Sequence, residues 1–490
     1  MKKISLLALF LCLCLMFGMV GAPAAVAEDP SESTAPNITN LVPNSTFDGT
    51  DASITHGCRT LEAQTPLHGS GPLLQYAGSA LLYEVNSGTM LYFYNPDQPM
   101  DPSSLVKIMT AMLAIESGKM DEMVTVTRSA LDSVSTNAVN AHLQPGEQMS
   151  LRNLVYCMLV GSANDACAVI AEYLSGSQQG FVDMMNRRAR ELGCTATVYA
   201  NPHGLHDPAQ TTTARDMARI LLVAMELPDY IEICGTAEYT VPATNYSDER
   251  FLKTVNKMLD KEHFYTYYDR RMTSGRTGTT NEDKRCLAAT AEGEEFRYIA
   301  IVLGATPVYR EDDPNSIRKH GNFEDTYALL NLGFKKHSSS QVLYKGQIVE
   351  QYSVSGGAND IVVGPDEDLR CIFPGEADAD SLVIRTQMTK YPLTAPIKKG
   401  DRVAVMQVWY GNICIAQTDL LAKNSSEVSL ELNQQGNGAG TGFDAGALST
   451  AMTLLIVIGV VIVALCIGLF VIRKIRKSAR SGRTRRRRRS

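Results

Sequence analysis

The chain has 490 residues, about three domains' worth, which is ample for a sizeable hydrophobic core. Its 44% hydrophobic and 20% charged residues exclude a wholly disordered or collagen-like protein. The net charge of −6 hides an asymmetry: residues 473–490 carry 11 Lys and Arg and no acid, and the remaining body is too acidic to be a good nucleic-acid binder.

The N-terminus has the layout of a secretory signal peptide. Two lysines precede an apolar stretch over 6–20, and a small-residue cleavage site, Ala-Val-Ala, follows at 25–27. We therefore expect residues 1–27 to be a signal peptide. Residues 28–74 are rich in Ser, Thr, Pro and Asn with little periodicity, which predicts a disordered spacer.

The segment over 75–337 predicts an α/β or α+β domain. It begins with two short β-rich runs within 79–94, broken by Asn-Ser-Gly, which is a hairpin signal. Two further strands flank Glu292-Gly293 within 285–305. A strand–helices–strand order places these late strands beside the first hairpin in one sheet. Apolar residues at helical spacing between the strands predict four helices, over 104–117, 151–160, 165–174 and 181–192.

The pattern changes after about residue 340, where only strands are indicated. Short β-rich runs separated by turn residues predict a small all-β domain over 338–430. A glycine-rich linker over 431–450 follows, and then 22 residues without a charge, 451–472, which are enough to cross a bilayer. The basic tail at 473–490 would stay in the cytoplasm, so we expect a single-pass membrane protein whose folded part is extracytoplasmic.

The first motif with chemical meaning is Ser104-Leu105-Val106-Lys107, at the start of the first predicted helix. Residues i and i+3 share a helix face, so the lysine amine can reach the serine hydroxyl, and the helix N-terminus offers N–H groups to an oxyanion. Taken alone, Ser104 would fit an ordinary helix N-cap beside a solvated lysine better than a catalytic role. A second match, Ser316 to Lys319, lies in a polar, acidic loop, and we interpret it as a chance match.

Two further motifs follow along the chain. Ser162-Ala163-Asn164 lies in the short break between two apolar helices, where polar side chains can face a cleft. A competing S-x-N at 135–137 lacks these flanking helices, and we discount it. Arg276-Thr277-Gly278 opens a polar segment just before the late strands. A cation, a hydroxyl and a glycine at the start of a strand can bind a carboxylate and let a substrate backbone approach closely.

With these three motifs in this order, the sequence resembles the serine-type D-alanyl-D-alanine carboxypeptidases, the low-molecular-mass penicillin-binding proteins, whose signature is S-x-x-K, S-x-N and K-T-G. The likeness covers roughly residues 75–425 and includes SALLYEVNSGTMLYFYN, DPSSLVKIMTAMLAIE, NPHGLHD and SGRTGTTNEDKRCLAATA. One departure is that the third motif is R-T-G. Arg276 keeps the positive charge and gains a bidentate fork, but it cannot deprotonate.

The resemblance implies a penicillin-binding/β-lactamase-like transpeptidase domain of the α/β (α+β) class, followed by a small all-β domain. It also implies three catalytic residues. Ser104 would be the acylated nucleophile and Lys107 its base, with a pKa lowered by burial. Ser162 would relay a proton to the departing D-alanine.

The resemblance implies the substrate contacts as well. Asn164 would hold the substrate amide, and Arg276 and Thr277 would bind the terminal carboxylate. Gly278 would leave room for the substrate backbone. The backbone N–H groups of Ser104 and Thr279 would form the oxyanion hole.

The function implied is removal of the terminal D-alanine from peptidoglycan stem peptides through an acyl-enzyme, on the cell-wall side of a bacterial membrane. The partners would be stem peptides ending in D-Ala-D-Ala, and β-lactams would act as acylating inhibitors. No cofactor, metal or nucleic acid is implied.

Three alternatives stay open. A zinc carboxypeptidase would draw on His203, His206 and Asp207, which lie in a Pro/Gly loop and not on an H-E-x-x-H helix. A β-lactamase would share Ser104, Lys107 and Ser162, although the all-β domain and the membrane anchor argue against it. A non-catalytic sensor or wall-binding protein that kept the fold is supported only by Arg276.

Overall fold

In a computed structural model of the chain, the structure describes residues 45–47, 61, 66–67, 73–375 and 382–429. The expected signal peptide, glycine-rich linker, membrane segment and basic tail lie outside these residues. Within the described ranges, no helix combines the length and apolar character needed to cross a membrane.

The first domain is built around a five-stranded sheet with the order β3-β2-β10-β9-β8, in which every neighbouring pair is antiparallel. The late strands pair onto the first hairpin as expected, from Tyr298 opposite Glu84 to Leu303 opposite Ser79. β8 forms one edge of the sheet. The five strands are β2 (Ser79–Glu84), β3 (Thr89–Tyr94), β8 (Met272–Thr279), β9 (Arg285–Glu292) and β10 (Arg297–Ala305).

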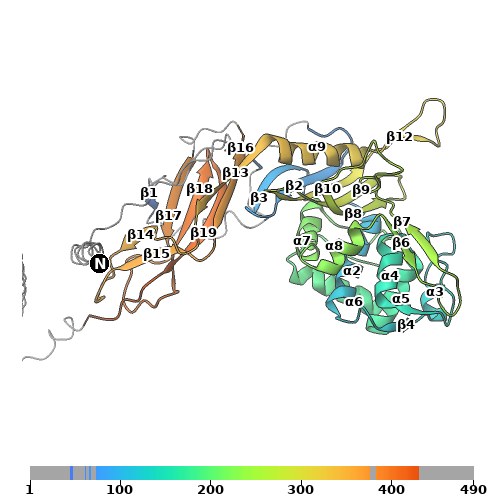
Figure 1. Ribbon diagram of the computed structural model, residues 1–490, viewed down its shortest axis with the longest axis horizontal. Helices are drawn as coiled ribbons and strands as arrows, with labels where there is room; N and C mark the ends of the chain where they lie inside the picture. The colour runs from blue at the N-terminus through green and yellow to red at the C-terminus, as the bar shows by residue number, and fades with distance from the viewer. Residues whose placement is uncertain (1–44, 48–60, 62–65, 68–72, 376–381, 430–490) are drawn as a thin grey trace, which may run out of the picture. The chain divides into compact units, whose positions relative to one another are not determined.

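Helices cover both faces of this sheet (Figure 1). The long helix α9 packs against β9 and β10 on one face, and the other helices gather on the opposite face around a large apolar core. The four helices expected from apolar spacing are confirmed as α2, α4, α5 and α6, whereas α7, α8 and α9 were not predicted. The helices are α2 (Val106–Glu116), α3 (Arg128–Asp132), α4 (Leu151–Leu159), α5 (Asn164–Ser175), α6 (Gln178–Glu191), α7 (Ala214–Ala224), α8 (Pro228–Gly235) and α9 (Gly321–Lys336).

Among the described residues, three small two-stranded sheets border this domain, one of which, β6–β7, lies on the helical side. They are formed by β4 (Met123–Thr125) with β5 (Gln148–Ser150), β6 (Glu238–Val241) with β7 (Arg250–Lys253), and β11 (Val308–Tyr309) with β12 (Ile317–Lys319).

Helix α2 is the centre of the domain and differs from its predicted form. An amphipathic helix was expected, but every residue from Val106 to Ala114 is buried, including Lys107 and Thr110. Such a helix lies inside a core and presents no polar stripe to solvent. Thr110 satisfies its hydroxyl by donating to the Pro202 carbonyl at 2.7 Å.

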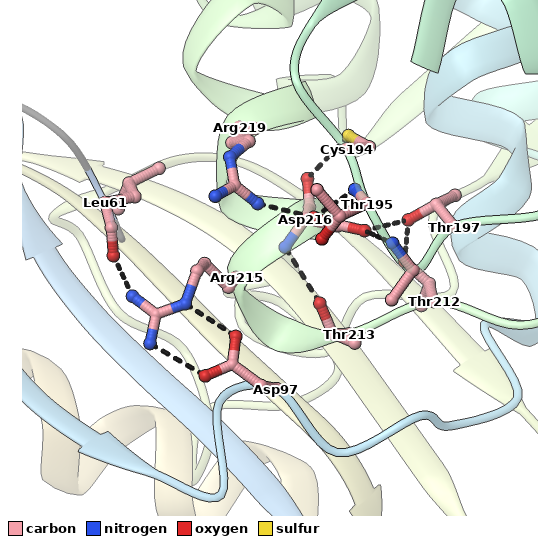
Figure 2. Close-up of polar contacts among 11 residues, drawn as sticks. Leu61, Asp97, Cys194, Thr195, Thr197, Thr212, Thr213, Arg215, Asp216 and Arg219 are labelled. Carbon is pink, nitrogen blue, oxygen red and sulfur yellow. Dashed lines mark hydrogen bonds and ion pairs between the residues drawn. The ribbon is translucent and has the colours of Figure 1, made fainter. Parts of the chain in front are cut away.

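A buried polar network at the start of α7 anchors the chain segment that precedes residues 201–206 (Figure 2). Thr213 caps the helix by accepting from the Asp216 N–H. The Asp216 carboxylate in turn accepts from the Ala196 N–H at 2.9 Å and from the Thr197 hydroxyl at 2.8 Å. Arg219 pairs with the same carboxylate at 2.5 Å. These contacts fix a loop that leads directly into the site described below.

The all-β domain expected over 338–430 is confirmed as a class, and it contains a mainly antiparallel six-stranded sheet with the order β1-β17-β18-β19-β15-β14, plus the pair β13–β16. Strand β16 was not predicted. The strands are β13 (His337–Leu343), β14 (Glu350–Tyr352), β15 (Ile361–Pro365), β16 (Leu369–Pro374), β17 (Leu382–Met388), β18 (Arg402–Tyr410) and β19 (Ile413–Ala422).

A few residues of the segment over 28–74 are among those that the structure describes. Strand β1 (Ser45–Phe47) pairs in parallel with β17. Leu61 and Leu67 are buried in the two apolar cores, and the Leu61 carbonyl accepts a hydrogen bond from Arg215.

Candidate active site

The candidate nucleophile sits in a tight turn that leads into α2. Ser104 is the middle residue of the 3₁₀ helix η2 (Ser103–Leu105), and neither η2 nor α2 has a side-chain cap. The alternative of an ordinary N-cap is therefore wrong. Ser103, with φ +47°, is held by the Asp101 carboxylate at its N–H, 2.8 Å, while its hydroxyl donates to the Thr279 carbonyl at 2.6 Å. These contacts fix the turn and leave the Ser104 hydroxyl for Lys107.

Lys107 is completely buried and contacts the candidate nucleophile directly. Its Nζ lies 3.1 Å from Ser104 Oγ. The same nitrogen donates to Asn164 Oδ1 at 2.8 Å and to the His203 carbonyl at 2.5 Å. Burial, with a smaller contribution from the positive charge of Arg276, lowers the pKa of Lys107 to about 7.

The three partners of Lys107 determine how its neutral amine is oriented. A neutral amine has two N–H groups and one lone pair. The Asn164 Oδ1 and His203 carbonyl oxygens can only accept, so they take both N–H groups. The lone pair is then left to face the Ser104 hydroxyl, which is the arrangement of a general base beside a nucleophile.

The S-x-N motif lies where it was expected, in the break between α4 and α5. Ser162 has a left-handed backbone, φ +61°, and is partly exposed. Asn164 is the first residue of α5 and is buried. Both polar atoms of the Asn164 side-chain amide bond to protein groups. Its Nδ2 donates to the Val139 carbonyl at 2.9 Å, and its Oδ1 accepts from Lys107.

The R-T-G motif does not open a segment before the strands, as was predicted, but lies within β8 near its end. Arg276 is 1% exposed and turns inward. Its Nε donates to the Ser104 carbonyl at 3.3 Å, its Nη1 donates to the Leu159 carbonyl at 2.9 Å, and its Nη2 donates to Ser162 Oγ. Among the described side chains, no carboxylate forms an ion pair with Arg276 or Lys107, so the charge of Arg276 is buried at this site without a counter-charge.

Two glycines, Gly278 in β8 and Gly204 in a loop, allow the turn that carries Ser104 (the nucleophile turn) to pack closely against β8. A Cβ at Gly278 would lie 3.1 Å from Ser103 Cβ and 3.2 Å from the Ser104 nitrogen. A Cβ at Gly204, where φ is +83°, would lie 2.0 Å from the Ser103 carbonyl oxygen. A substrate backbone was expected to approach Gly278 closely, but in the structure the turn that carries Ser104 lies against this glycine.

A cavity of about 540 Å³ brings the predicted residues together. Asn137, from the discounted S-x-N motif, contributes to its wall, whereas the second S-x-x-K motif at 316–319 does not. Lys107 lies beneath the cavity and is not part of its lining. The lining residues that the sequence predicted are Ser104, Ser162, Asn164, Arg276, Thr277, Gly278 and Thr279.

Sequence reasoning missed the role of the Pro202–His206 segment at this site. His203 contributes its carbonyl to Lys107, while its Nδ1 accepts from the Leu205 N–H at 3.2 Å. Burial and the Lys107 charge lower the pKa of His203 to about 3. His206 instead contacts Asp101 at 3.0 Å. The two histidines are therefore engaged separately, and they do not present the converging donors that the zinc alternative requires.

Comparison with known proteins agrees with this geometry. The family model "D-alanyl-D-alanine carboxypeptidase" matches residues 69–307, and that of the penicillin-binding protein 5 C-terminal domain matches 338–428. D-alanyl-D-alanine carboxypeptidase DacF of Bacillus subtilis is 29% identical over 356 residues, covering 72% of this chain and 86% of DacF. The D-alanyl-D-alanine endopeptidase of Pseudomonas aeruginosa is 30% identical over 252 residues, covering 51% of this chain and 78% of that protein.

Solved structures of similar proteins share this fold. Penicillin binding protein 5 from Haemophilus influenzae superposes with a TM-score of 0.62 at 27% identity, and the match covers 73% of this chain and 100% of that one. Penicillin binding protein 6B from Escherichia coli, at 24% identity and a TM-score of 0.54, shares the fold. The chain therefore belongs to the D-alanyl-D-alanine carboxypeptidase family.

Proposed function

We propose that this protein is a serine-type D-alanyl-D-alanine carboxypeptidase that removes the terminal D-alanine from peptidoglycan stem peptides and is inhibited by penicillins. One observation carries the proposal: the buried Lys107 amine lies 3.1 Å from Ser104 Oγ, and its other two partners can only accept hydrogen bonds. The family's named activity gives the substrate class.

The proposed reaction begins with acylation. Ser104 Oγ attacks the carbonyl carbon of the penultimate D-alanine while its proton passes to Lys107. The backbone N–H groups of Ser104 and Thr279 stabilise the oxyanion, an assignment supported by the close packing of β8 on the nucleophile turn. The C–N bond then breaks, and the leaving nitrogen takes a proton relayed through Ser162, releasing D-alanine. Water hydrolyses the ester and regenerates Ser104.

The proposed role of Arg276 combines binding and positioning. Leaving a cation buried without a counter-ion costs several kcal/mol, so the burial of Arg276 favours an anionic ligand in the adjoining cavity. A guanidinium has five N–H donors, and three protein acceptors take one donor each. The remaining donors support binding of the carboxylate that peptides and penicillins share.

We expect Arg276→Ala to lose about 10- to 150-fold in acylation rate, which is the effect of removing one charge-assisted hydrogen bond worth about 1.5–3 kcal/mol. Arg276→Lys should stay within about tenfold, because the charge survives. Second-order acylation rates with penicillin measure both effects, and Arg187→Ala, at an exposed position, is the matched control. An Ala variant as fast as wild type would exclude Arg276 from ligand binding.

The same series tests the sensor alternative, which is supported by Arg276 because its Nη2 donates a hydrogen bond to Ser162 Oγ, the proposed proton relay. If Arg276→Lys acylates at least about 100-fold faster than wild type, the arginine attenuates an enzyme that has turned towards sensing. The direct test of turnover uses the full-length protein in detergent with a pentapeptide ending in D-Ala-D-Ala. Release of free D-alanine supports the carboxypeptidase, whereas stoichiometric acylation by penicillin without D-alanine release contradicts it.

The proposal includes a location, which rests on the sequence at the two ends of the chain. A cleavable signal over 1–27 and an apolar segment over 451–472 followed by basic residues support a single-pass protein with its catalytic domain on the cell-wall side. Protease added to intact cells or spheroplasts should digest the catalytic domain and spare an epitope fused to the tail. Protection of the catalytic domain would refute this topology.

A further inference from the structure

The turn between β8 and β9 borders the cavity and holds a chain of hydrogen bonds that the mechanism above does not use. Thr279, the last residue of β8, pairs across the two strands with Arg285, the first residue of β9. Thr279 is exposed and lines the cavity. The Arg285 side chain is only 21% exposed and lies beside it.

Arg285 decides how the Thr279 hydroxyl can hydrogen-bond. The Nη1 of Arg285 donates to Thr279 Oγ1 at 2.7 Å. Because a guanidinium carries donors only, the threonine oxygen must accept in this bond, and its single proton is left for an acceptor elsewhere. The Thr279 carbonyl is also fixed, because Ser103 Oγ donates to it at 2.6 Å. The hydroxyl is thus set as a donor on a residue that lines the cavity.

Arg285 is itself held in place by its neighbours in the turn. Its Nη2 pairs with Asp283 Oδ1 at 2.5 Å, and the Tyr309 hydroxyl, from β11, donates to the other oxygen of the same carboxylate. Asp283 has φ +58°, a left-handed backbone that Asp tolerates better than most residues. Both arms of the guanidinium are therefore occupied, which fixes its orientation towards Thr279.

We propose that Arg285, held by Asp283, is a positioning residue that presets the Thr279 hydroxyl as a hydrogen-bond donor towards the carboxylate of the bound ligand. The inference rests on the proposed function for the identity of the ligand. The charge on Arg285 also polarises the hydroxyl and makes it a stronger donor. Arg285 acts only through Thr279, because its arms are bonded to protein atoms.

A double-mutant cycle tests this relationship. The full-length protein in detergent is assayed for D-alanine release from the pentapeptide and for penicillin acylation, as wild type, Thr279→Val, Arg285→Met and the double variant. We expect each single variant to lose about tenfold in kcat/KM, more through KM than through kcat, as for a hydrogen bond to a charged acceptor. The double variant should be no slower than Thr279→Val, and Arg285→Lys should recover most of the loss.

Two controls separate positioning from general damage. Arg310→Met removes an exposed arginine of the β11–β12 hairpin, whose side chain pairs with Asp312, and should behave as wild type. Additive losses of about 100-fold in the double variant, or an Arg285→Met protein equal to wild type, would overturn the inference. A wild type that releases no D-alanine would refute the proposed function instead, and the acylation rates of the same variants would still decide the role of Arg285.

Discussion

Ser104→Ala should abolish both labelling by fluorescent penicillin and release of D-alanine. The hydroxyl is the atom that forms the ester, and no other group in the cavity lies against the Lys107 amine as a nucleophile. We expect the loss in turnover to be on the order of 10⁴-fold or more, as for removal of a nucleophile from a serine hydrolase. Gel fluorescence after incubation with the labelled penicillin measures the first effect, and a D-alanine assay measures the second.

Ser316→Ala is the matched control for this experiment. Ser316 heads the second S-x-x-K match, but it lies in the β11–β12 hairpin and does not line the cavity. This variant should label as wild type does. Labelling that survives the loss of Ser104 would refute the assignment of the nucleophile, whatever the behaviour of Ser316→Ala.

The second large effect is expected for Lys107→Met, which keeps an unbranched side chain in the buried position but removes the base. General-base catalysis contributes about 10²- to 10⁴-fold, so acylation by penicillin should fall by a factor in this range. Lys261→Met, at an exposed position, should leave the rate unchanged. A Lys107→Met protein that acylates within a few-fold of wild type would show that the serine proton goes elsewhere.

The pH dependence of the wild type gives an independent check on Lys107. Its pKa is lowered to about 7, and the neutral amine is the active base. The acylation rate should therefore rise as pH increases through about 7 and level off above it, falling about tenfold per pH unit on the acid side. Stopped-flow acylation across pH 5 to 9 would reveal this limb, and its absence in Lys107→Met would assign it.

The fold could be predicted where side-chain periodicity dictates it. The first hairpin and the helices at 151–160, 165–174 and 181–192 follow from local pattern and were found within a few residues. The strand β8 could not be predicted, because Ser-Gly-Arg-Thr-Gly reads as a polar turn. Its glycines serve long-range contacts, since a Cβ at Gly275 would lie 2.5 Å from the Asn256 amide and one at Gly278 would crowd the nucleophile turn. Tertiary packing overrides local propensity in such a strand.

The sequence predicted which side chains belong to the candidate site, but not the hydrogen bonds that hold them. The order of the three motifs placed Ser104, Lys107 and Arg276 near one another, and the structure brings them together. The contribution of the His203 carbonyl had no signal of its own, because any residue supplies a carbonyl and only the backbone path puts it there. The inward turn of Arg276 was missed for the same reason, since two of its three acceptors are main-chain oxygens.

The burial of α2 on every side has a consequence for the timing of motions in this protein. An amide in a fully enclosed central helix exchanges its hydrogen only when most of the domain opens, so α2 should belong to the slowest-exchanging set. The serine at its head is therefore carried by the least mobile part of the chain, and local opening of the outer hairpins leaves it in place. The fraction of molecules that penicillin acylates then reports the fraction in which the whole domain is folded. During denaturation this acylated fraction should fall together with the protection of the slowest-exchanging amides, and not with the earlier opening of the peripheral elements.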